Sequence, residues 1–145
     1  MSRIRNYTST VPATKSIMEI EKRLVSAGCT NIVKTYMDGQ ITGLIFTIRQ
    51  NERDIPFRMP ARVERIREKL AESMRKPRRG TMDRLLSQAD RTAWKLLSDW
   101  VDVQLSLVEL GQADMVEIFL PYAYDHKSKS TLYDRVVTGD LKLLT

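Results

Sequence analysis

The sequence predicts an α+β fold, in which a three-stranded antiparallel meander is packed by helices, one of them long. Three observations predict it. Residues 83–110 contain no Gly or Pro and repeat apolar side chains at helical spacing. The dipeptide Asp38-Gly39 separates two stretches that are rich in β-branched and aromatic residues, which is the pattern of a hairpin. Further along, Ile55, Phe57 and Met59 alternate with Pro56, Arg58 and Pro60, which indicates an edge strand because Pro cannot donate to a ladder.

Length and composition suit one domain, predicted to span 1–145. The chain has 145 residues, of which 42% are hydrophobic and 29% charged, and these are ordinary values for a chain that buries a core. No run of eighteen apolar residues occurs, and the first residues lack the apolar core of a signal peptide. The single cysteine, Cys29, cannot form an internal disulfide, so a reducing cytoplasm is the expected setting.

The first helix is predicted at 16–27, after a loose basic arm at 1–10. Ser16 and Glu19 have the spacing of a capping box, in which each side chain accepts from the other residue's backbone amide. Gly28 follows at the position where a helix commonly ends in a left-handed residue.

The meander is predicted to follow directly. Its strands are expected at 31–37, 41–49 and 53–58, with the middle strand central because it is apolar on both faces near Leu44-Ile45-Phe46. The third strand is the edge strand that contains Pro56.

Two helices are predicted next, at 61–74 and 83–110, separated by the break Arg75-Lys-Pro-Arg-Arg-Gly80. The longer one carries two adjacent apolar rows, a face wide enough to be buried against several neighbours. The first row comprises Leu86, Ala89, Ala93, Leu97, Trp100 and Leu107, and the second comprises Leu85, Trp94, Val101, Leu105 and Val108. We therefore expect both tryptophans to be buried, with Leu97 and Val101 between them.

The remainder, 123–145, is predicted to be mostly polar loop and tail. Before it, Gly111 ends the long helix, and Asp114 and Glu117 cap a short helix that Pro121 stops. A polar loop at 125–130, a last turn of helix at 131–137 and an extended tail at 141–144 complete the chain.

The positive charge is concentrated in one segment. The formal net charge is +6, yet residues 58–95 contain twelve Lys/Arg and five Asp/Glu, a net of +7, so the rest of the chain carries −1. Concentrated charge of this kind indicates an anionic partner. Within the long helix, Arg84, Arg91 and Lys95 fall on a single stripe because they are seven and four residues apart. The predicted anion-binding residues are Arg58, Arg75, Lys76, Arg78, Arg79, Arg84, Arg91 and Lys95.

Catalytic chemistry, metal ligation and cofactor binding are not predicted. No P-loop, GxGxxG, GxSxG or HExxH motif occurs, and the only histidine, His126, lies in a polar loop. Cys29 is expected to be a buried small hydrophobe, since no base lies near it in sequence. Asp99 and Asp102 are neighbours on one helix face and suggest a metal-dependent nuclease as a minor alternative. An i,i+4 salt bridge from Lys95 to Asp99 explains this pair better.

Several segments together resemble a group of small proteins encoded in bacteriophage and prophage genomes. These segments are Val11-Pro12, Ile55-Pro-Phe-Arg-Met-Pro60, Arg91-x-x-Trp94 with Asp99-Trp-Val101, Gln104-Leu105 and Glu109, and Val116-Glu-Ile-Phe-Leu-Pro-Tyr122. The match runs in order from about residue 11 to 122. The resemblance implies a phage setting, and hence the cytoplasm of an infected or lysogenic bacterium. It implies no activity and assigns no functional residue.

Two functions remain open at this point. The first is a non-enzymatic accessory protein that binds DNA or RNA, without sequence preference, through the basic surface at 58–95. The second is a host-interaction or counter-defence protein that binds a host protein or a small phosphate-rich nucleotide. The two differ in their expected salt dependence, because backbone binding to nucleic acid weakens steeply as salt rises.

Overall fold

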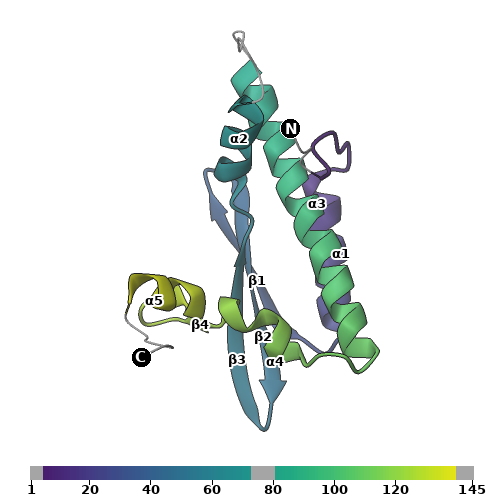
Figure 1. Ribbon diagram of the computed structural model, residues 1–145, viewed down its shortest axis with the longest axis vertical. Coiled ribbons are helices and arrows are strands. Elements are labelled where there is room, and N and C mark those ends of the chain that lie inside the picture. Colours follow the sequence, from purple (N-terminus) through teal and green to yellow (C-terminus); the bar gives the residue numbers. More distant parts are fainter. Residues whose placement is uncertain (1–4, 73–80, 140–145) are drawn as a thin grey trace. The chain divides into compact units, whose positions relative to one another are not determined.

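The computed structural model (Figure 1) describes residues 5–72 and 81–139; residues 1–4, 73–80 and 140–145 lie outside the described part. It has the predicted α+β fold. In chain order the elements are α1 (Ala13–Ser26), β1 (Thr30–Met37), β2 (Gln40–Gln50), β3 (Arg53–Pro60), α2 (Val63–Glu72), α3 (Thr81–Glu109), α4 (Met115–Phe119), the 3₁₀ helix η1 (Leu120–Tyr122), β4 (Tyr124–Asp125), β5 (Ser130–Thr131) and α5 (Leu132–Thr138).

The contacts of the chain fall into two compact units, each made from two segments. Unit 1 comprises Met1–Arg23 and Ala61–Val103, and unit 2 comprises Leu24–Pro60 and Gln104–Thr145. The division passes through α1 and α3, so each of these helices contributes to both units. Among the described residues, no helix has both the length and the hydropathy that crossing a membrane would require.

The sheet of unit 2 is the predicted meander, with the order β1-β2-β3 and antiparallel pairing throughout. Asp38 and Gly39 have φ values of 51° and 78°, so the tight turn between β1 and β2 has the positive φ at both positions that was expected. The central position of β2 and the edge position of β3 are both confirmed. Pro56 lies opposite Thr47 in β2, and the other side of β3 meets only an isolated bridge from Phe57 to Ala123 among the described residues.

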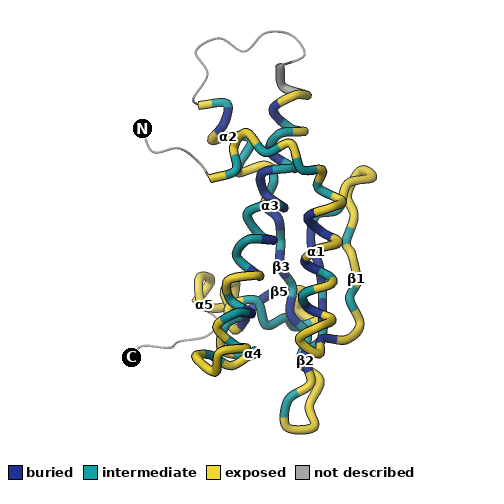
Figure 2. The backbone as a smooth tube through the Cα atoms, turned by 90° about the vertical axis from the view of Figure 1, so that its right-hand side faces the viewer, coloured by how far each residue is buried: buried dark blue, intermediate teal, exposed yellow. Residues whose placement is uncertain are grey.

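The core of unit 2 is built on three phenylalanines from distant parts of the chain. Phe46 of β2 stacks on Phe57 of β3, with ring centroids 5.7 Å apart, and Phe119 of α4 meets Phe46 edge-on at 5.1 Å. All three side chains are fully buried. Figure 2 shows the contrast between the buried middle of β2 and the mostly exposed β1.

In unit 1, the antiparallel helices α2 and α3 form a hairpin with an apolar seam. Leu70 of α2 clusters with Leu85 and Ala89 of α3, and further apolar residues of α2 pack against them, namely Val63, Ile66 and Ala71. The apolar residues that repeat at helical spacing in both segments are the ones that form this seam.

The prediction for the tryptophans is correct for Trp94 and wrong for Trp100. Trp94 and Val101 are fully buried, whereas Leu97 and Trp100 are only partly buried. The buried face of α3 is centred on the second predicted row, where Leu85, Trp94, Val101 and Leu105 are all buried. The first row is divided. Ala89 and Ala93 are fully buried, whereas its larger members are partly buried or exposed, namely Leu86, Leu97, Trp100 and Leu107.

The predicted start of the first helix is also wrong. α1 begins at Ala13, and the Ser16 amide donates to the Pro12 carbonyl inside the first turn, so Ser16 is not a cap. The fixed φ of Pro12 favours a helix start three residues earlier than the capping box suggested. The Ser16 hydroxyl is instead buried, without a hydrogen-bond partner among the described residues.

The segment after α3 contains more structure than was predicted. The Asp114–Glu117 capping box of α4 is present, and α5 confirms the helix predicted at 131–137. The expected loop at 125–130 is instead a small hairpin of β4 and β5, whose strands are too short to leave an alternation in the sequence. A second capping box, formed by Thr131 and Asp134, starts α5. The predicted tail at 141–144 lies outside the described residues.

The burial of the two tryptophans predicts different costs of truncation. Trp94→Ala should lower the free energy of unfolding by about 3–5 kcal/mol, as expected for removing a fully buried large side chain. Trp100→Ala should cost clearly less, since this residue is only partly buried. Urea denaturation of the two variants measures the difference, and an equal or larger loss for Trp100→Ala would contradict this description of the buried face.

Candidate functional site

The basic segment is centred on the connection between α2 and α3. The described helices end at Glu72 and resume at Thr81, and they are held side by side by the apolar seam. Four of the predicted anion-binding residues, Arg75, Lys76, Arg78 and Arg79, belong to the intervening 73–80 and lie outside the described residues. The structure describes the two helices that flank this segment, α2 before it and α3 after it.

The helix before the connection contributes no net charge. Between Val63 and Glu72, α2 contains three basic and three acidic residues. Arg67 donates both its Nε and its Nη2 to Glu64, and Lys69 lies 3.5 Å from Glu72. Charges paired one turn apart largely cancel at a distance, so α2 adds little to the positive potential.

Within the predicted stripe of α3, the three basic residues have different surroundings. Arg84 is exposed and makes no polar contact with a described residue. Arg91 is partly buried, and it donates from Nε to the Ser9 carbonyl at 3.2 Å and from Nη2 to Gln88 Oε1 at 2.7 Å. The Lys95 ammonium lies 3.0 Å from Asp99 Oδ1. The structure therefore gives Arg91 and Lys95 internal partners and leaves Arg84 available to a ligand.

Arg58 has a separate environment, because it lies on β3 in unit 2. Its guanidinium carbon is 5.9 Å from the centroid of the Tyr124 ring, which is within the range of a cation–π contact. The described members of the predicted set thus divide between the two units.

The N-terminal arm is not loose over its described part, and this prediction is wrong for residues 5–9. The Thr92 hydroxyl donates to the Asn6 carbonyl at 2.9 Å, and Gln88 Nε2 donates to the Ser9 carbonyl at 3.1 Å. The Asn6 side chain donates to Asp99 Oδ2 at 2.9 Å. A polar edge on α3 therefore fixes the arm, which the apolar periodicity of the sequence could not show.

Asp99 and Asp102 are held by cations of the chain itself. Asp99 accepts from Asn6 and Lys95 and lies 3.4 Å from Arg5, while Asp102 accepts from Arg23 Nε at 3.0 Å. The predicted salt bridge from Lys95 to Asp99 is confirmed. In the described part of the chain, no group of three or more His, Cys, Asp or Glu side chains is arranged to hold a metal ion.

Two carboxylates of α3 have pKa values shifted in opposite directions. Burial raises the pKa of Asp99, but hydrogen bonds from Asn6, Lys95 and Arg5 outweigh burial and bring it below its ordinary value. At Asp90, burial dominates and the pKa is raised, although Arg91 and the nearby Trp94 indole partly oppose it. The indole N–H lies beside the carboxylate without reaching full hydrogen-bond geometry.

The remaining candidates for reactivity have plain surroundings. Cys29 is buried, as predicted, and burial raises the pKa of its thiol to about 11, so the thiol is protonated at neutral pH. His126 is exposed in the turn between β4 and β5, and its ring meets the Tyr124 ring edge-on at 5.0 Å.

Two polar residues on the buried face of α3, Thr92 and Ser98, were not predicted from the sequence. Thr92 is fully buried and fixes the arm through its hydroxyl. Ser98 is also buried, and its hydroxyl makes no hydrogen bond to a described residue. Both residues lie three or four positions from apolar residues of the long helix. This spacing was the available signal, because it places their side chains on the buried face.

No protein-family model, curated protein or solved structure matches the chain. The resemblance to phage-encoded proteins consequently stays a prediction.

The opposite pKa shifts predict opposite effects of neutralising the two carboxylates. The lowered pKa of Asp99 stabilises the fold at pH values above the ordinary Asp pKa, and this contribution is lost as pH falls through the lowered value. Asp99→Asn should therefore destabilise at pH 7 by about 1.5–3 kcal/mol, the usual range for hydrogen bonds to a charged group. The raised pKa of Asp90 makes its ionised form a cost, so Asp90→Asn should stabilise at pH 7.

Denaturation at pH 7 and at pH values below the lowered pKa of Asp99 measures both effects. Each difference from the parent protein should shrink towards zero in acid, because both carboxylates are then protonated in the folded and unfolded states. Changes of the same sign for the two variants at pH 7 would contradict these assignments.

Proposed function

We propose that this protein is a non-enzymatic nucleic-acid-binding accessory protein, with a phage setting, that contacts the phosphate backbone through the connection between α2 and α3. The observation that carries the proposal is the distribution of charge. Residues 73–80 contain four basic residues and no acidic one, whereas the helix before them is electrically balanced. The segment thus contributes most of the positive excess of residues 58–95.

The internal partners of the other basic residues support this assignment. Arg91 and Lys95 are engaged in fixing the arm and Asp99, so their loss would alter the fold as well as any binding. Arg84, one turn inside α3, is exposed and adds one charge near the helix start. Basic residues near a helix N-terminus oppose the helix dipole and so do not stabilise the helix. An anionic partner is therefore a better explanation for positive charge at this position.

Binding of this kind is expected to read the backbone and not the bases. Lys and Arg neutralise phosphates and release counterions, a contribution that does not depend on sequence. The sequence contains no zinc-finger or RRM signature that would carry base recognition. The expected ligand is therefore DNA or RNA, bound weakly and with little sequence preference.

A protein partner is the second candidate, and one observation favours it. β1 is an edge strand of its sheet, and it exposes Val33, Tyr36 and Met37 by 53%, 61% and 69%. An edge strand that presents apolar side chains can pair with a strand of another protein. A host protein bound at β1 is the counter-defence alternative to nucleic-acid binding.

Replacing Arg75, Lys76, Arg78 and Arg79 with Ser together tests the first proposal. Gel shifts with single-stranded DNA, double-stranded DNA and RNA should show a large loss of affinity. The dependence of log affinity on log salt should flatten by about one unit for each phosphate contact removed. The nucleic acid should remain intact when Mg²⁺ is present. Cleavage would instead support the nuclease alternative at Asp99 and Asp102.

A matched control removes the same charge elsewhere. Lys15, Arg49, Arg53 and Lys127 are exposed and lie outside 58–95, so replacing these four with Ser should reduce affinity far less. Equal losses in the two variants would show that only net charge matters. A parent protein that binds no nucleic acid even at low salt would reject the proposal in favour of the partner at β1.

A further inference from the structure

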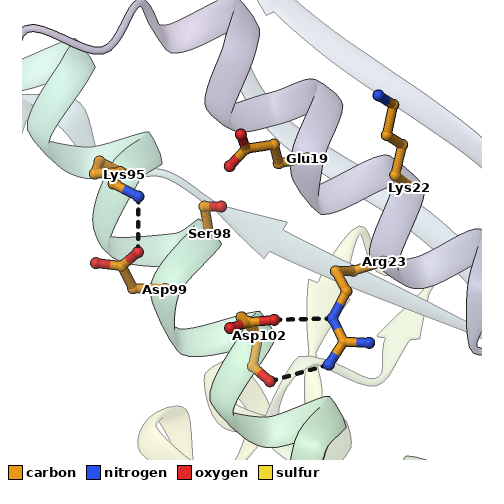
Figure 3. A pocket seen from close by; sticks show the side chains of 7 residues that line it. All are labelled: Glu19, Lys22, Arg23, Lys95, Ser98, Asp99 and Asp102. Atoms are coloured by element: carbon orange, nitrogen blue, oxygen red, sulfur yellow. Dashed lines mark hydrogen bonds and ion pairs between the residues drawn. The ribbon is translucent and has the colours of Figure 1, made fainter.

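Unit 1 contains a cleft between α1 and α3 that the proposed nucleic-acid contact does not use. Its volume is about 360 Å³, and the side chains that line it are polar or charged. Figure 3 shows the Glu19 carboxylate and the Ser98 hydroxyl directed into the space between the two helices, with Lys22 at the rim. A volume of this size lies within the range of small-molecule sites.

Two ion pairs give the cleft fixed walls. Arg23 of α1 donates from Nε to Asp102 Oδ1 at 3.0 Å and from Nη2 to the Asp102 carbonyl at 3.3 Å. Along α3, Lys95 is held by Asp99 at 3.0 Å. Because these four side chains are already paired, they shape the cleft and leave its recognition to the remaining groups.

Three polar groups of the cleft make no hydrogen bond or ion pair with a described residue. Ser98 is only 8% exposed, and its hydroxyl faces the cavity. Solvent still reaches this hydroxyl from the cleft, so a ligand group can replace water as its hydrogen-bond partner. Glu19 and Lys22, one turn apart on α1, provide one negative and one positive charge with no internal counterion.

We propose that this cleft binds a small zwitterion of the α-amino-acid class. The ligand ammonium would pair with Glu19 and with the Ser98 oxygen, and its carboxylate would pair with Lys22. The lining contains three cationic and three anionic side chains, and this balance opposes a phosphate or a bare metal cation, each of which would meet repulsion from half of the lining. A molecule that carries both charges a few atoms apart satisfies both unpaired groups at once.

Amide NMR spectra of the full chain, recorded with each proteinogenic amino acid in turn at millimolar concentration, test the proposal. At least one amino acid should shift the signals of residues 19–23 and 95–102 in a saturable way. For that amino acid, the N-acetyl form lacks the ammonium and the carboxamide form lacks the carboxylate. Each form should bind at least about tenfold more weakly, the factor expected for losing one charged hydrogen bond.

Variants of the chain supply the matching evidence. Glu19→Gln and Lys22→Gln should each weaken binding about tenfold or more, and Ser98→Ala should weaken it while keeping the fold. Lys15→Gln, which removes the same charge from an exposed position of α1 outside the lining, should bind like the parent. Nucleic-acid binding should be unchanged in Glu19→Gln, which separates this site from the proposed function.

Two results would overturn the proposal. One is that no amino acid shifts the signals of the two helices at millimolar concentration. The other is that binding survives in both Glu19→Gln and Lys22→Gln, because the two unpaired charges would then not be the recognition groups.

Discussion

The buried face of α3 is the constraint on which the rest of this structure depends. Leu85, Trp94, Val101 and Leu105 are withdrawn from water along one side of the helix. Several polar residues between and beside them have hydrogen-bond partners near the same surface. Thr92 does so by donating to the arm at Asn6, and Asp99 does so by accepting from three donors. The hydrophobic effect fixes the helix, and hydrogen bonds at the margin of its buried face then fix the N-terminal segment.

The same constraint separates structural charges from charges that are available to a ligand. Arg23, Arg91 and Lys95 neutralise or orient groups of unit 1. Burial raises the pKa of Asp99, but hydrogen bonds from Asn6, Lys95 and Arg5 outweigh it and lower the pKa. An ion pair at the surface adds little stability, but several that share one partly buried edge act together. Four basic residues belong to the sequence between α2 and α3, at 73–80, while Glu19 and Lys22 at the cleft make no ion pair with a described residue. Both proposed binding sites therefore use charged groups that the described ion pairs do not include.

Much of the fold could be predicted from the sequence, because its strongest signals are local. The positive φ of the Asp38-Gly39 turn, the missing amide of Pro56 and the apolar rows of α3 each act within a few residues. The errors arise where a distant contact decides. The capping signal at Ser16 yields to the helix start at Pro12, and the arm at 5–9 is fixed by side chains more than 80 residues away. The candidate site was predictable mainly as a count of charges. The local Lys95–Asp99 pair could be predicted, but the contact of Arg91 with the distant Ser9 carbonyl could not.

The salt dependence of nucleic-acid binding by the parent protein tests the central claim most directly. If the four charges of 75–79 carry the contact, the logarithm of the affinity should fall linearly with the logarithm of salt. The slope should be about −3.6 on duplex DNA, which is roughly 0.9 for each of four phosphates. Additional participation by Arg84 would steepen it by about one further unit. A slope near zero, or tight binding that persists at high salt, would contradict the account.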